Sequence, residues 1–257
     1  TLFKSIISMK TRNPIIFSFH PQALKSSIAA AKIVRDAAIA AGAPEGCIQW
    51  IEEPSLEKTT ALIQNPKIAK LINHPGVAST LATGGPGMVK AAYSTGKPAL
   101  GVGPGNGPVY IEKTANILRA VNDLVLSKTF DNGMICATEN SAVIDTDIYA
   151  EVKKELVKNG VFFVEKKDQD KLAEAMFNPK TGGVKGPIAG KSAKGIAKLA
   201  GIKVPDNTKV LAAEITGVGP KYPLSAEKLS PVFTLYKAEN SAQAFKICTD
   251  LLNYGGR

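Results

Sequence analysis

The chain has 257 residues, of which 44% are hydrophobic, and a formal net charge of +10. This composition supports a packed core of one large domain or two modest ones, and no apolar run has the length of a membrane span. The first residues do not resemble a signal peptide, so we expect a cytoplasmic protein with no membrane partner. With two His and three separated Cys, we expect neither a metal site nor a disulfide framework.

The positive charge could attract nucleic acid, an anionic membrane or an anionic small molecule. Lysines are densest between Lys180 and Lys209. No aromatic residues interleave with them, which disfavours a base-stacking surface, so we expect no nucleic-acid partner. The stretch favours a solvated lysine-rich face, and the alternative is attraction for a polyphosphate ligand.

Short apolar runs and helical patterns alternate along the first half of the chain. The runs predict strands at residues 15–19, 47–51, 77–82, 98–102 and 109–111. Apolar spacing and stop signals predict helices at residues 24–41, from the cap Ser55 to about residue 64, from glycines 84–87 to about residue 94, and at residues 115–128. Such alternation is typical of an α/β protein with a parallel sheet.

The second half continues the alternation. Strands are predicted at residues 142–144, 161–164, 210–215 and 232–236. Helices are predicted at residues 148–158, with Asp147 as N-cap, and at residues 170–176, 192–199 and 242–252. A boundary is predicted near residues 126–136, where a long helix meets a polar loop.

Cys136 lies in a polar, Gly-containing segment, residues 127–139. Asn132 and Gly133 precede it, which suits a thiol that must meet a substrate, because the thiolate is the nucleophile. Cys47 and Cys248 lie beside apolar runs and are interpreted as core residues. A lone Cys is more often inert than catalytic, so its setting alone leaves the role of Cys136 open.

Two Gly-rich segments could bring the backbone close to a ligand. Thr83, Gly84 and Gly85 stand between a strand and a helix, where helix amides suit a phosphate. A tight turn explains this segment equally well. Residues 101–108 contain four glycines and two prolines, and by themselves favour a structural connector over a ligand-contacting loop.

Together these segments resemble the aldehyde dehydrogenase superfamily, in particular its coenzyme-A-acylating branch and the acylating half of bifunctional aldehyde–alcohol dehydrogenases. The resemblance is carried by residues 10–18, 41–44, 82–93, 127–139 and 229–231. It implies an α/β, aldehyde dehydrogenase-like fold in two incomplete parts. These are a Rossmann-type NAD-binding domain at residues 1–126 and an α/β catalytic domain at residues 127–257.

The resemblance also implies roles for individual residues. Cys136 matches the nucleophile, which would attack the aldehyde and hold the acyl group as a thioester until coenzyme A takes it. Thr83, Gly84 and Gly85 match the turn beside the NAD pyrophosphate. Glu227 matches the residue that holds the nicotinamide ribose. The amide of Cys136 would be one oxyanion donor.

Departures from hydrolytic relatives favour the acylating branch. Val102 stands where those enzymes carry a Glu that activates water, and valine cannot act as a base. Ser18 replaces a Lys that contacts the adenosine ribose, and His20 is a candidate ligand-pocket residue. Gly103 and Gly105, in the second Gly-rich segment, are also assigned to cofactor binding.

The resemblance places an oxyanion Asn upstream of Thr1 and a Gly-His segment after Arg257. We therefore expect the chain to be part of a larger domain, poorly active by itself, and in its parent a dimer or filament with a possible fused alcohol dehydrogenase domain. The alternatives are a monofunctional acylating enzyme and a non-catalytic assembly module of the same fold.

Overall fold

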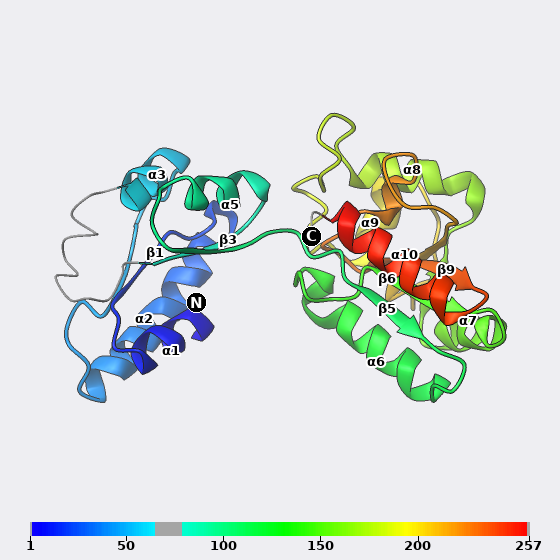
Figure 1. The fold of residues 1–257 in the computed structure, drawn as a ribbon, viewed down its shortest axis with the longest axis horizontal. Coiled ribbons are helices and arrows are strands. Elements are labelled where there is room, and N and C mark those ends of the chain that lie inside the picture. The colour runs from blue at the N-terminus through cyan, green and yellow to red at the C-terminus, as the bar shows by residue number, and fades with distance from the viewer. Residues whose placement is uncertain (1, 65–78, 256–257) are drawn as a thin grey trace. The chain divides into compact units, whose positions relative to one another are not determined.

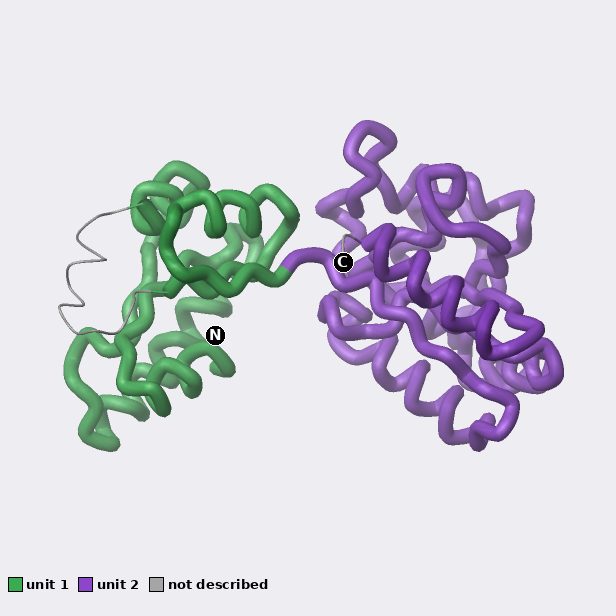
Figure 2. Tube along the Cα trace, in the orientation of Figure 1, with its two compact units in different colours: residues 1–102 green, residues 103–257 purple. Residues whose placement is uncertain are grey.

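The computed structural model describes residues 2–64 and 79–255. The chain forms two compact units, residues 1–102 and 103–257 (Figure 2). Helix α6 (Ile117–Thr129) belongs to the second unit, because it packs against helix α7 and the sheet there. The compact units therefore divide before this helix, whereas the predicted domain boundary after residue 126 falls inside it. The division of NAD binding and catalysis between two domains stays a prediction.

The first unit contains two parallel strand pairs. Strand β1 (Ile15–Phe17) pairs with β2 (Ile48–Trp50), and β3 (Thr80–Thr83) pairs with β4 (Ala99–Val102). Its helices are α1 (Leu2–Lys10), the 3-10 turn η1 (Pro21–Ala23), α2 (Leu24–Ala40), α3 (Leu56–Gln64) and α5 (Pro86–Tyr93). Phe17, Cys47 and Ile48 form a small buried core against α2. Helix α1 was not predicted, since its sequence lacks a clear start signal.

The second unit is a five-stranded parallel sheet in the order β5-β6-β9-β8-β7. The strands are β5 (Pro108–Ile111), β6 (Ser141–Asp145), β7 (Val161–Phe163), β8 (Val210–Glu214) and β9 (Val232–Ala238). The helices are α6, α7 (Tyr149–Lys158), α8 (Lys166–Met176), α9 (Ala193–Leu199) and α10 (Ser241–Tyr254), with 3-10 turns η2 (Phe130–Gly133) and η3 (Pro223–Ser225). Helices α6 and α7 cover one face, and α8, α9 and α10 cover the other (Figure 1).

Local capping explains where several helices begin. Ser192 accepts a hydrogen bond from the Gly195 amide at 3.2 Å, and Ser55 accepts one from the Lys58 amide at 3.0 Å, as predicted. The predicted cap Asp147 is wrong: α7 follows Ile148, and no side chain caps it.

The α/β class is confirmed, and each predicted strand and helix has a counterpart, with ends shifted by a few residues. Residues 77–78 of the third predicted strand lie outside the described residues. Cys47 is buried and Cys248 is half-buried, in agreement with their interpretation as packing residues. Among the described helices, none is long and apolar enough to cross a membrane.

Candidate active site

The segment that carries Cys136 lies at the amino-terminal edge of the second unit's sheet. It leads directly into β6, while residues 103–107 lead into β5 and residues 227–231 lead into β9. Since β5, β6 and β9 are adjacent and parallel, these three loops meet at one edge. Open α/β sheets usually bind ligands at the opposite, carboxyl-terminal edge.

Cys136 is solvent-exposed in a turn closed by a hydrogen bond from the Thr138 amide to the Ile135 carbonyl at 3.0 Å. Three residues with positive φ precede this turn: Asp131 (48°), Asn132 (49°) and Gly133 (63°). A Cβ on Gly133 would lie 2.6 Å from the Ser230 carbonyl oxygen. Only glycine fits there, so the base of the turn is packed tightly against the loop before β9.

The second Gly-rich segment packs directly on the Cys136 backbone. A Cβ on Gly105 would lie 2.5 Å from the Cys136 carbonyl oxygen, a separation that side chains do not adopt. The next residue, Asn106, is fully buried, and its Nδ2 donates to the Ser225 and Leu251 carbonyls, each at 2.9 Å. The segment therefore clamps the backbone of the Cys136 turn, which is more than the connector that its composition favoured.

Glu227 is held against this clamp. Its Oε1 accepts a hydrogen bond from the Gly105 amide at 2.8 Å. The structure thus brings together Cys136, Gly105 and Glu227, three of the predicted site residues, within one compact unit. Gly103, also predicted, begins this unit. In the described part of the chain, the Cys136 amide has no hydrogen-bond partner, as an oxyanion donor requires.

Two lysines are fully buried behind the Cys136 turn. The Lys128 Nζ donates to Thr138 Oγ1 at 3.3 Å, and the Lys228 Nζ donates to the Asn140 and Ala226 carbonyls at 2.9 Å. Burial lowers the pKa of Lys128 to about 7, against the opposing charges of two glutamates. Burial, with the positive charge of Lys128, lowers the pKa of Lys228 well below its usual range.

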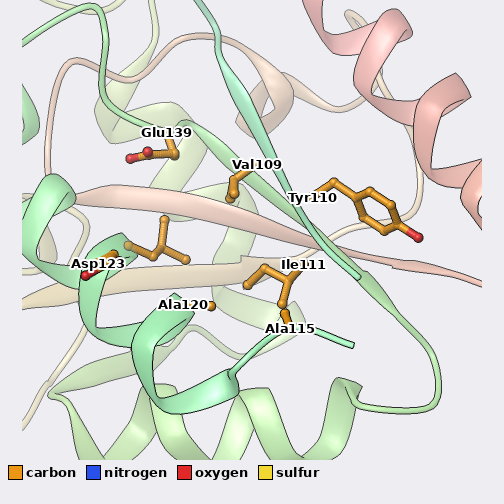
Figure 3. Close-up of a pocket in the computed structure, with 8 residues that line it drawn as sticks. Val109, Tyr110, Ile111, Ala115, Ala120, Asp123 and Glu139 are labelled. Atoms are coloured by element: carbon orange, nitrogen blue, oxygen red, sulfur yellow. The ribbon is translucent and has the colours of Figure 1, made fainter. Parts of the chain in front are cut away.

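Glu139 directly follows Thr138 and lines a cavity of about 240 Å³ beside edge strand β5 (Figure 3). The other lining residues come from β5, α6 and the segment between them: Val109, Tyr110, Ile111, Ala115, Ala120, Asp123 and Leu124. The Glu139 Oε2 is buried and accepts no hydrogen bond from the described residues. The negative charge of Glu139 raises the pKa of Lys128, in opposition to burial. Glu139 is therefore a counter-charge for this lysine.

The other predicted cofactor residues lie in the first unit, at the carboxyl ends of β1 and β3. Thr83 Oγ1 accepts a hydrogen bond from the Lys4 Nζ at 3.1 Å, and the Gly84 amide donates to the Val102 carbonyl at 3.0 Å. Gly85 precedes α5, and a Cβ on it would meet open space. The turn thus presents uncrowded backbone at a helix N-terminus, which fits a pyrophosphate.

Ser18 and His20 have local roles in the same unit. Ser18 Oγ lies 2.6 Å from Thr59 Oγ1, and His20 Nδ1 accepts the Gln22 amide at 3.3 Å, capping η1. The capping contact gives His20 a structural function. Neither contact tests the predicted role in ligand binding.

Sequence reasoning missed the buried polar residues behind the Cys136 turn, namely Lys128, Thr138, Asn140, Lys228 and Ser230, and the half-buried Glu139 with its buried Oε2. For Lys128 a signal was present. The buried stripe of α6 is Val121, Leu124, Val125 and Lys128, which is the i, i+3, i+4, i+7 spacing of a core-facing helix. A lysine in the apolar stripe, at the last turn before a cysteine loop, indicates a buried charge.

The model of the aldehyde dehydrogenase family matches residues 2–252. The chain belongs to this family. It is 52% identical to aldehyde-alcohol dehydrogenase 2 of Entamoeba histolytica, over all of this chain and 29% of that protein. An acetylating aldehyde dehydrogenase from Geobacillus thermoglucosidasius has a TM-score of 0.90 at 44% identity, over 99% of this chain and 54% of that one.

A third family member is a propionaldehyde dehydrogenase from Rhodopseudomonas palustris, solved with bound CoA and an acylated cysteine. Its TM-score is 0.80 at 31% identity, and the match covers 93% of this chain and 52% of that enzyme's chain. The chain therefore spans about half the length of these solved enzymes and under a third of the Entamoeba protein.

Proposed function

We propose that the chain forms the nucleophile-bearing part of a coenzyme-A-acylating aldehyde dehydrogenase that interconverts a short aldehyde with its acyl-CoA. The observation that carries the proposal is the Cys136 turn, whose thiol is exposed while Gly105 and Gly133 pack its backbone tightly. An exposed thiol on a rigidly held turn suits a covalent catalyst, because the reacting atom is accessible and its position is preorganised.

In the proposed reaction, the Cys136 thiolate adds to the aldehyde carbon. The Cys136 amide, which has no partner among the described residues, donates to the oxygen that becomes negative. NAD, when bound, supplies the acceptor for the hydride that leaves this carbon. Cys136 then holds the acyl group as a thioester, and the thiol of coenzyme A displaces the Cys136 sulfur. The acylated cysteine and CoA of the Rhodopseudomonas enzyme support this sequence of steps.

Thr83, Gly84 and Gly85 would hold the pyrophosphate of the cofactor, since their turn is uncrowded and opens α5. Ser18 and His20, at the end of β1, would lie near its adenosine part. An engineered glycolyl-CoA reductase with bound NADP+ has a TM-score of 0.80 at 31% identity, which supports a nicotinamide cofactor. We infer NAD from the resemblance of these segments to the acylating branch.

We further infer that Gly103, Gly105 and Glu227 support the nicotinamide end of the cofactor. Glu227 is fixed by the Gly105 amide, so its second carboxylate oxygen is available as an acceptor for a ribose hydroxyl. We also infer a cytoplasmic homo-oligomer fused, in its parent, to an alcohol dehydrogenase domain. The name of the Entamoeba relative supports the fusion.

Transfer to a thiol is favoured over hydrolysis because Val102 ends β4 and carries no base. A monofunctional acylating enzyme would share this chemistry. The solved acetylating enzyme, of which the chain covers 54%, supports that alternative equally. Sequence beyond residue 257 would separate the two.

The proposal is tested on a full-length protein that carries this chain. Acetyl-CoA and NADH are mixed with the wild-type protein and with the Cys136→Ala variant, and NADH absorbance is followed. The variant is expected to lose the reaction by a factor of about 10⁴ or more, because the covalent step depends on this nucleophile. Undiminished turnover in the variant would refute the assignment. The exposed Lys198→Met variant serves as the control and should retain activity.

A further inference from the structure

The buried groups behind Cys136 have no part in the proposed reaction, yet they meet at the base of its turn. Thr138 Oγ1 accepts a hydrogen bond from the Lys128 Nζ at 3.3 Å and donates one to the Gly133 carbonyl at 3.5 Å. The segment between Gly133 and Thr138 contains Cys136. The Thr138 side chain therefore closes this segment by its hydrogen bond to Gly133, and Lys128 donates to that same side chain.

A lysine is a costly choice for such a position. Lys128 is 0% exposed, and an ionised amine without water requires a counter-charge and hydrogen-bond partners. Among the described residues only Thr138 accepts from it. A leucine or methionine on the same helix stripe would fill the space without this cost, so packing alone does not explain the residue.

Glu139 supplies the counter-charge that Lys128 requires. Its Oε2 is buried and unbonded in the described part of the chain, and its charge opposes the effect of burial on Lys128. Glu227, which accepts a hydrogen bond from the Gly105 amide, also raises the pKa of Lys128. Two carboxylates, one beside Thr138 and one bonded to Gly105, thus favour the protonated form of this buried amine.

We propose that Lys128, with Glu139 as its counter-charge, is a positioning residue that acts through Thr138 to hold the turn presenting Cys136. The inference rests on the proposed function only in naming Cys136 as the nucleophile.

The charged groups that face Lys128 are Glu139, Glu227 and Lys228. Burial lowers the pKa of Lys128 to about 7, so its charge changes within the range where cysteine alkylation is readily measured. Below pH 7 the amine carries its proton, so its hydrogen bond to Thr138 is charge-assisted and stronger. Above pH 7 the amine is neutral, so its hydrogen bond to Thr138 loses the charge assistance and holds the turn less firmly.

The test measures the rate at which iodoacetamide alkylates Cys136 in the 257-residue chain, with the modified peptide identified by mass spectrometry to separate it from Cys47 and Cys248. Lys128→Met should lower the rate at least tenfold, and Thr138→Val should lower it similarly. The double variant should be no slower than the slower single one, because both changes remove the same contact. In the control variant Lys198→Met, which changes an exposed residue, Cys136 should be alkylated at the wild-type rate.

The ratio of wild-type to Lys128→Met rates is then followed from pH 6 to 9. It should be largest below pH 7 and fall as the pH rises through 7. A wild-type rate in Lys128→Met, a ratio that does not change with pH, or multiplying effects in the double variant would each overturn the proposal. If circular dichroism shows that Lys128→Met is unfolded, Thr138→Val decides the outcome by the same criteria.

Failure of the proposed function gives a different result. If the full-length Cys136→Ala protein reduces acetyl-CoA at the wild-type rate, Cys136 is not the catalyst, whatever the alkylation rates show. If that variant is inactive while Cys136 in the Lys128→Met variant is alkylated at the wild-type rate, the proposed function stands and the positioning role of Lys128 is refuted.

Discussion

Replacing Lys128 with methionine should make the chain more stable, and the gain should depend on pH in a predictable way. In the unfolded chain the amine keeps its proton up to a pKa of 10.5, whereas in the folded protein burial lowers that pKa to about 7. Between these values the unfolded state binds more protons, so the free energy of unfolding of the wild type rises with pH. Below pH 7 the folded protein carries the full cost of a buried ammonium.

The size of the stability gain follows from the pKa shift of Lys128 between the unfolded and folded states. A change from 10.5 to about 7, at about 1.4 kcal/mol per unit, corresponds to roughly 5 kcal/mol of ionisation cost below pH 7. Loss of the hydrogen bond to Thr138 offsets about 1 kcal/mol of the gain at every pH. The advantage of Lys128→Met should therefore approach 4 kcal/mol near pH 6.5 and shrink by up to about 1.4 kcal/mol for each pH unit above 7.

The assay is urea unfolding at pH 6.5, 7.5 and 8.5, followed by circular dichroism. Tryptophan fluorescence would report on the wrong unit, since the single tryptophan is Trp50 in the first one. Lys198→Met is the matched control, because the same change on an exposed helix position should alter stability by less than about 0.5 kcal/mol. An advantage of Lys128→Met that stays constant from pH 6.5 to 8.5 would refute the argument, because it would show that Lys128 does not titrate there.

Three further changes probe the packing of the site. Gly105→Ala, whose Cβ would lie 2.5 Å from the Cys136 carbonyl oxygen, should slow alkylation of Cys136 by iodoacetamide at least tenfold; an unchanged rate would contradict the clamp. Asn106→Ala should lower the urea-unfolding free energy by about 2–4 kcal/mol, since two buried carbonyls lose their donor, and a loss under 0.5 kcal/mol would speak against it. Leu229→Gly should raise the free energy of unfolding by about 1 kcal/mol, because Leu229 has a φ of 45°; a lower value than that of the wild type would contradict this strain.

Much of the architecture could be predicted from local patterns. Short apolar runs and helical spacing located the strands and helices of the α/β fold, and Ser55 and Ser192 mark helix starts by their own hydrogen bonds. Asp147 failed as a cap because its position one residue before Ile148 leaves its carboxylate outside the first turn of α7. Element type depends on nearby residues, whereas end positions depend on contacts that the local pattern does not contain.

The candidate site divides in the same way. Cys136 and the glycines around it were identified in the sequence, because a polar, Gly-rich setting is a property of adjacent residues. The role of Gly105 as a clamp was not, since its contacts are with Cys136 and with Glu227, which is 122 positions away in the chain.

By itself, the sequence determined the α/β class and the family resemblance and predicted Cys136 as the nucleophile, all from segments of a few residues. Only the tertiary structure decided that Cys136 lies at the amino-terminal edge of the sheet, and that Lys128 is buried behind its turn. The physical reason is that strand order and burial arise when distant segments pack together. The cost of a charged side chain depends on that burial, so the electrostatics behind Cys136 appear only in the folded unit.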